Sequence, residues 1–119
     1  FCPLEGQCVK GDLTMGENIG DLGGLEMAYA AYHLSLGGKE APVIDGFTGD
    51  QRFFMAHTQV WRAMQRDDAL VNQMRTDPHS PAAARGSLPE RNIDAWYTAF
   101  GVKEGDKAFI APEGRVHIW

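Results

Sequence analysis

The sequence has few cysteines, and their spacing is not that of a metal-binding motif. Cys2 and Cys8 are the only two, and they form neither a C-x-x-C pair nor half of a larger cluster. This spacing excludes a zinc knuckle. A disulfide that closes a small N-terminal loop and a pair of free thiols are both consistent with the pattern. The disulfide would indicate an oxidising compartment.

Long apolar runs and clusters of basic residues are also missing. No stretch approaches the roughly 20 apolar residues that a membrane-spanning helix needs, so we expect no membrane contact by this segment. Sixteen acidic and eleven basic side chains give a net charge of −5, and the basic ones are scattered along the chain. We therefore expect no nucleic-acid partner.

The chain begins at Phe1-Cys2-Pro3, without an initiator methionine or the basic flank of a signal peptide. This start leads us to expect a polypeptide that was processed or cut from a longer one. In other respects the sequence is that of an ordinary globular protein. Its 119 residues, 44% hydrophobic and 23% charged, suffice for one domain with a modest core.

Helix-start signals and apolar periodicity predict a mainly α-helical fold. A Ser or Thr followed three residues later by Glu or Gln is the signature of a capping box. It occurs three times, at Thr14 with Glu17, Thr48 with Gln51, and Ser87 with Glu90. The spacing of apolar residues predicts helices at residues 17–36, 50–65, 67–75 and 89–100, separated by long loops at 37–48 and 101–119.

One face of the first predicted helix combines small residues with two carboxylates. Glu17 and Asp21 lie one turn apart at its N-terminal end and would repel each other, so a positive group should lie near them. They either complement the helix N-terminus, or Glu17 binds a metal and Asp21 orients another ligand. The rest of this face, which would allow another helix to approach closely, consists of Gly24, Ala28, Ala31 and Ser35.

Several separated motifs resemble those of the neprilysin and endothelin-converting-enzyme family of zinc metallopeptidases, and its bacterial members in particular. The stretch GENIGDLGG at residues 16–24 is similar to the family's E-N-x-x-D motif. Further matches follow in the family's order: DGFTGDQRFF at 45–54, QVW at 59–61, TDPHSP at 76–81 with Arg85 beyond it, and RVHIW at 115–119. Because these motifs extend over nearly the whole chain, the sequence is identified as a member of the family.

The resemblance implies two residues at a zinc site. Glu17 would be the third protein ligand of a catalytic zinc, and Asp21 would accept a hydrogen bond from a zinc-bound histidine. A carboxylate can complete two imidazoles around zinc and leave a fourth position for water.

Four more residues would act on the substrate. His79 would donate to the oxyanion that forms during peptide hydrolysis, and Arg85 would hold a substrate backbone carbonyl. Val60 and Trp61 would line the pocket for the side chain that follows the scissile bond. Each has a simpler interpretation: His79 lies between two prolines and could be a turn residue, Arg85 could pair locally, and Val60 and Trp61 could be core.

One essential motif of the family is absent. The H-E-x-x-H helix, which supplies two histidine ligands and the general base, has no counterpart in the 119 residues. We expect it upstream of Phe1, in a partner segment of the same polypeptide that packs against the small-residue face. Residues 1–119 would then be the C-terminal helical part of a thermolysin-like (gluzincin) catalytic domain, inactive alone and with little or no affinity for zinc.

The expected activity of the intact protein is that of a zinc metalloendopeptidase. The resemblance implies cleavage of oligopeptides on the N-terminal side of hydrophobic residues. The family's habit and the two cysteines favour an extracytoplasmic location, whether periplasmic, secreted or in an ectodomain. The alternative is a non-catalytic helical module, descended from such an enzyme, that serves as an interaction or scaffold domain.

Overall fold

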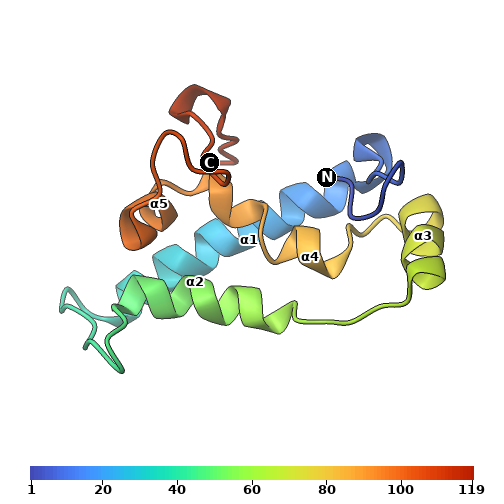
Figure 1. The fold of residues 1–119 in the computed structure, drawn as a ribbon. Helices are drawn as coiled ribbons and strands as arrows, with labels where there is room; N and C mark the ends of the chain where they lie inside the picture. Colours follow the sequence, from blue (N-terminus) through green and yellow to red (C-terminus); the bar gives the residue numbers. More distant parts are fainter.

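A single long helix organises the molecule, and the other helices lie around it (Figure 1). The computed structural model describes all 119 residues and measures 46 × 30 × 27 Å along its principal axes. Helix α1 (Gly11–Ser35) is followed by α2 (Gly49–Val60), which returns alongside it. The remaining elements are α3 (Asp67–Thr76), α4 (Ala82–Arg85), the 3-10 turn η1 (Pro89–Asn92), α5 (Asp94–Phe100) and a second 3-10 turn η2 (Pro112–Gly114). The fold is thus mainly α, as the sequence predicts.

The core lies where α1, α2 and the segment around α5 meet. Leu22 and Leu25 of α1 pack with Phe54 of α2 and with Ile93, which separates η1 from α5. All four side chains are buried, and Phe54 is only 1% exposed. Burial of aliphatic and aromatic side chains of this size contributes about 1.5–3 kcal/mol each. The apolar residues whose spacing predicts the first helix therefore include the ones that face the core.

An aspartate joins the end of α1 to the start of α2. The hydroxyl of Tyr29 donates to Asp50 Oδ2 at 2.8 Å, and His33 Nε2 lies 3.0 Å from Asp50 Oδ1. Burial, together with the hydrogen bond to Asp50, raises the pKa of Tyr29. The phenol therefore stays protonated and remains a hydrogen-bond donor between the two helices.

One of the three predicted capping boxes is confirmed. Thr48 Oγ1 accepts from the backbone N–H of Gln51 at 3.2 Å, and the Gln51 side chain accepts from the backbone N–H of Thr48 at 3.0 Å. The other two predictions are wrong. The hydroxyls of Thr14 and Ser87 instead donate to the carbonyls of the residues four positions earlier, so they do not cap a helix start.

Helix boundaries differ from the predicted ones in three places. Helix α1 begins at Gly11 rather than at residue 17, so Thr14 lies inside it. Helix α2 ends at Val60, and the following residues form an extended link to α3. The helix predicted at 89–100 is interrupted at Ile93, whose backbone is extended, and it ends at Gly101 in the left-handed conformation that glycine favours.

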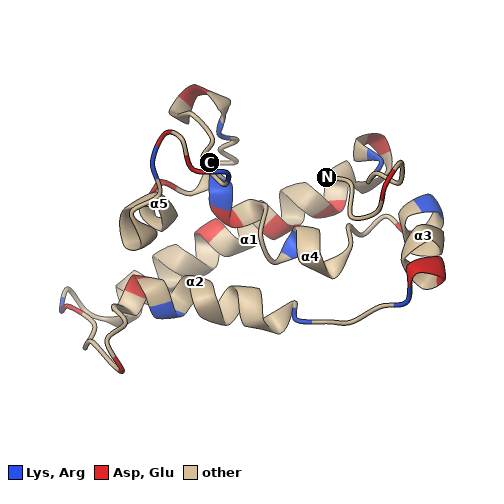
Figure 2. Cartoon of the chain, viewed as in Figure 1, with Lys and Arg blue, Asp and Glu red and all other residues tan.

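The termini and the surface complete the description. Cys2 and Cys8 form a disulfide, which decides between the two states that the sequence left open. Figure 2 shows Lys and Arg distributed over separate elements rather than gathered on one face. None of the helices combines the length and the apolar composition needed to cross a membrane.

Candidate functional site

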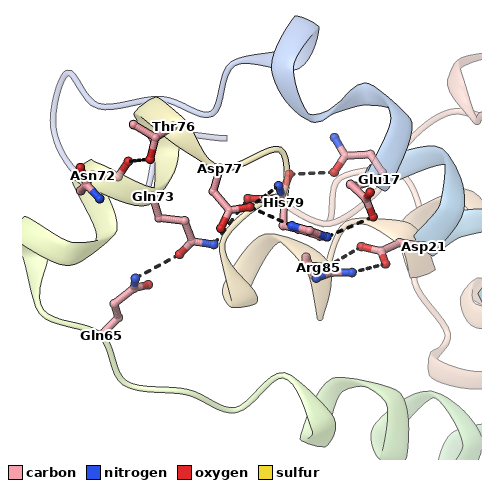
Figure 3. A network of polar contacts seen from close by, with 11 residues as sticks. Glu17, Asp21, Gln65, Asn72, Gln73, Thr76, Asp77, His79 and Arg85 are labelled. Atoms are coloured by element: carbon pink, nitrogen blue, oxygen red, sulfur yellow. Dashed lines mark hydrogen bonds and ion pairs between the residues drawn. The ribbon is translucent and has the colours of Figure 1, made fainter.

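Four of the six predicted site residues come together where α1 passes the loop before α4 (Figure 3). Glu17 and Asp21 are one turn apart on α1 and so share a face. His79 belongs to the loop and Arg85 is the last residue of α4. Each carboxylate of α1 faces one of the two nitrogen-bearing side chains, which supplies the positive partner that the sequence predicts.

Arg85 binds Asp21 through two parallel hydrogen bonds. Its Nε donates to Asp21 Oδ2 at 2.7 Å, and its Nη2 donates to Oδ1 at 2.6 Å. The two side chains are only 18% and 15% exposed. The hydrogen bond to Asp21 raises the pKa of Arg85, so the guanidinium keeps its charge. Arg85 is therefore not paired locally, because its partner lies 64 residues away in the sequence.

His79 is held between two carboxylates. Its Nδ1 lies 2.8 Å from Asp77 Oδ1, and its Nε2 lies 3.2 Å from Glu17 Oε2. The same Asp77 oxygen accepts from the backbone N–H of His79 at 2.8 Å. This backbone hydrogen bond and the side-chain bond lower the pKa of Asp77, so its carboxylate stays ionised. The imidazole is thereby fixed with Nε2 directed to Glu17.

A second contact pins the His79 loop to α1. The hydroxyl of Ser80 donates to Asn18 Oδ1 at 2.7 Å, and Asn18 Nδ2 donates to Thr14 Oγ1 at 3.1 Å. Ser80 and Thr14 are both buried. Sequence reasoning assigned no role to Asn18, Asp77 or Ser80, although all three lie inside the motifs that carry the family resemblance.

Trp61 reaches this cluster, whereas Val60 does not. The Arg85 guanidinium carbon lies 4.0 Å from the centre of the Trp61 ring, a cation–π arrangement. Val60, the last residue of α2, is 77% exposed. Beside the cluster is a cavity of about 520 Å³, which Asp21 and Arg85 line together with apolar residues that include Met15, Ile19, Leu88 and Val116.

A complete metal site is not formed by these residues. No three His, Cys, Asp or Glu side chains come together in a way that could hold a metal ion. Glu17 is 47% exposed at its side chain, and a carboxylate oxygen is a usual zinc ligand. Glu17 thus fits the role of one ligand, and a metal bound there would need its other ligands from outside residues 1–119.

The helical scaffold presents an accessible carboxylate (Glu17), a histidine fixed by a carboxylate (His79) and a paired arginine (Arg85). These are the residue types of a metal-dependent hydrolase site. A family model supports this class. The model described as peptidase family M13 matches residues 1–116, and the chain belongs to this family.

Curated relatives come from animals and bacteria. The chain is 35% identical over 116 residues to Neprilysin-1 of Caenorhabditis elegans and 37% identical over 119 residues to Membrane metallo-endopeptidase-like 1 of Homo sapiens. It is 33% identical over 110 residues to Neutral endopeptidase of Lactococcus lactis. These alignments cover 93%, 95% and 92% of the chain. They cover only 15% or 16% of the relatives, so the chain spans about one sixth of their length.

A solved structure matches the fold. The zinc metalloprotease Zmp1 of Mycobacterium tuberculosis, in its open state, is 50% identical, with a TM-score of 0.92 over 95% of this chain and 18% of that protein. The same enzyme in complex with an inhibitor gives the same TM-score and identity. The predicted family and the mainly helical fold are therefore confirmed.

Proposed function

We propose that residues 1–119 are the C-terminal segment of the catalytic domain of a zinc metalloendopeptidase and that they carry part of its active site. The observation that carries the proposal is the contact of Glu17 with His79 beside the Asp21–Arg85 pair. These residues come from separate parts of the chain, and membership of peptidase family M13 supplies the chemical context.

Glu17 would be the third protein ligand of zinc. The two histidine ligands and the glutamate base would come from an H-E-x-x-H helix upstream in the same polypeptide. Zinc in such a site polarises the scissile carbonyl and lowers the pKa of a bound water. Asp21 would orient one of the histidines, since a carboxylate oxygen that accepts from Arg85 keeps a second acceptor position.

His79 would stabilise the negative charge that develops on the carbonyl oxygen of the scissile bond. Asp77 holds Nδ1, and Nε2, which contacts Glu17 in this structure, would donate to the substrate once Glu17 binds zinc. Because Asp77 fixes the ring before substrate binds, little reorganisation is needed in the transition state. A preorganised donor of this kind contributes about 3–4 kcal/mol to lowering the barrier.

Arg85 would bind a backbone carbonyl of the substrate. Asp21 occupies its Nε and Nη2, and Nη1 makes no hydrogen bond within the chain. Trp61, against which Arg85 stacks, would form one wall of the pocket for the hydrophobic side chain after the scissile bond. The exposure of Val60 leaves it available to line the same pocket. The substrates would be oligopeptides cut before a hydrophobic residue.

The surface of α1 supports a partner segment. Only 15 of the 119 residues are buried. Gly24, on the small-residue face, has no atom within 4 Å of the position that a Cβ would take. The H-E-x-x-H helix would cover this face. The Cys2–Cys8 disulfide supports an extracytoplasmic location for the protein.

The proposal is tested by the product of the complete gene. We expect a longer protein that contains H-E-x-x-H, binds one zinc ion and cleaves a short peptide before a hydrophobic residue, whereas isolated residues 1–119 do neither. Intact-mass analysis, zinc stoichiometry and a fluorogenic peptide assay measure these properties. A natural gene product that starts near Phe1 and lacks peptidase activity would contradict the proposal and support the scaffold alternative.

A further inference from the structure

A buried carboxylate, outside the group of residues described above, is linked to Trp61 through His57. Glu90 of η1 is 4% exposed, and its Oε1 lies 3.0 Å from Nδ1 of His57. The hydroxyl of Thr58 donates to the same oxygen at 2.9 Å. In this geometry a Glu90 carboxylate oxygen can accept the N–H of His57 Nδ1.

The other nitrogen of His57 faces Trp61. The Trp61 Nε1–H donates to His57 Nε2 at 3.4 Å, and an indole nitrogen can act only as a donor. His57 Nε2 must therefore be unprotonated. Glu90 and Trp61 together select the neutral Nδ1–H tautomer of His57. Nε2 accepts the indole N–H and is unprotonated, so the single proton of the neutral ring is on Nδ1, where it faces Glu90.

The ring of Trp61 is also confined on its other sides. A Cβ placed on Gly86 would lie 2.8 Å from the Trp61 Cβ, so the backbone of residue 86 approaches this side chain closely. The Gly86 carbonyl lies 3.0 Å from the Thr58 hydroxyl. Arg85 stacks on the ring at 4.0 Å. The indole thus occupies a fixed position between a hydrogen bond at its edge and the guanidinium at its face.

From this chain of contacts we infer that His57 and Glu90 are positioning residues for Arg85 that act through Trp61. Asp21 fixes the direction of the guanidinium through two hydrogen bonds, and the Trp61 ring fixes its plane. The inference rests on the proposed role of Arg85 in binding a substrate carbonyl. It adds that this role depends on the Nδ1–H tautomer of a histidine that does not touch the substrate.

The test compares His57→Asn and His57→Phe in the intact enzyme, with a short peptide as substrate. Asn can place an N–H where Nδ1 stood and keep the bond to Glu90, but it offers Trp61 no acceptor at the place of Nε2. Phe keeps the aromatic packing and loses both bonds. Both variants should raise KM on the order of threefold to tenfold and change kcat less than twofold, because a contact to a non-reacting carbonyl acts on ground state and transition state alike.

A structural control separates positioning from general loss of stability. Tyr97→Phe removes a hydroxyl that donates to the Arg91 carbonyl at 2.6 Å and accepts from the backbone of Ile110 at 3.1 Å, in a part of the molecule without contact to Arg85. This variant should lower the melting temperature and leave KM unchanged. If the His57 variants lose only thermal stability, as Tyr97→Phe should, the inference is wrong.

The coupling to Arg85 gives the decisive comparison. In an Arg85→Ala background, His57→Asn should raise KM no further, because the group that it positions is gone. The same multiplicative increase in both backgrounds would overturn the inference. If Arg85→Ala alone leaves KM unchanged, the proposed role of Arg85 fails. A crystal structure of His57→Asn then still tests the positioning: a displaced Trp61 and Arg85 supports it, and an unchanged 4.0 Å stack overturns it.

Discussion

Arg85 and Asp21 form two parallel hydrogen bonds across 64 residues of sequence. The pair joins the end of α4 to the face of α1 that also carries Glu17. A fork of two bonds fixes both the position and the orientation of the guanidinium, which a single contact to a point charge does not. The candidate substrate-binding group is therefore rigidly placed relative to the candidate zinc ligand.

Arg85→Lys tests this geometry in the intact enzyme. Lysine keeps the positive charge, but its ammonium group cannot reproduce the planar fork or the stack on Trp61. We expect KM for a short peptide to rise about tenfold with kcat nearly unchanged, measured by steady-state kinetics. Arg75→Lys is the matched control, because Arg75 is an exposed residue in the last turn of α3. Equal kinetics for the two variants would contradict the role of Arg85.

The His79 orientation should persist in acid, because Asp77 titrates unusually low. Its hydrogen bonds from His79 lower the pKa of Asp77 below the ordinary value of 3.8. A carboxylate with a lowered folded-state pKa contributes stability that is fully present above the ordinary pKa and is lost as the pH falls through the lowered one. A carboxyl carbon NMR titration of Asp77 should give a midpoint below 3.8. His79→Ala should raise the midpoint only in part, because it removes the side-chain bond and keeps the backbone N–H of residue 79, which lowers the pKa of Asp77 most. An ordinary midpoint before that substitution would contradict the geometry.

Zinc affinity of residues 1–119 alone tests whether the metal site is shared with another segment. Glu17 is the only ligand that we assign in this chain, and no cluster of three potential ligands is present. We expect isothermal titration to show binding no tighter than that of a surface carboxylate, and no difference between the chain and its Glu17→Gln variant. A sub-micromolar dissociation constant that Glu17→Gln abolishes would show that further ligands exist within these residues.

The sequence predicted those features that depend on local patterns. The sequence predicted the helix at α1 from its apolar spacing, the start of α2 at its Thr48 capping box, and a helix end at residue 100, where α5 ends. The same local signal failed at Thr14 and Ser87. A serine or threonine hydroxyl can either cap the start of a helix or donate to the carbonyl four residues earlier, as it does at both positions. Which bond forms depends on whether the preceding residues are helical, and the local motif does not show this.

The candidate site was predicted through motifs rather than through physical pattern. Two carboxylates one turn apart indicated a positive partner, but nothing local identified it as Arg85. The roles of Asp77 and Glu90 were missed because they act on histidines and not on a substrate. The Glu90 bond to His57 joins residues 33 positions apart, and such a contact is set by tertiary packing. A single sequence contains no local signal for it.

The most direct test of the central claim uses the Glu17→Gln and His79→Ala variants of the intact enzyme. In each variant, zinc content and turnover are measured in parallel. If Glu17 is a zinc ligand and His79 stabilises developing charge, Glu17→Gln should lose the metal and all activity. His79→Ala should retain one zinc ion and lower kcat by about 10²–10³-fold. Equal zinc content in both variants, whether full or lost, would contradict the separate roles of the two residues.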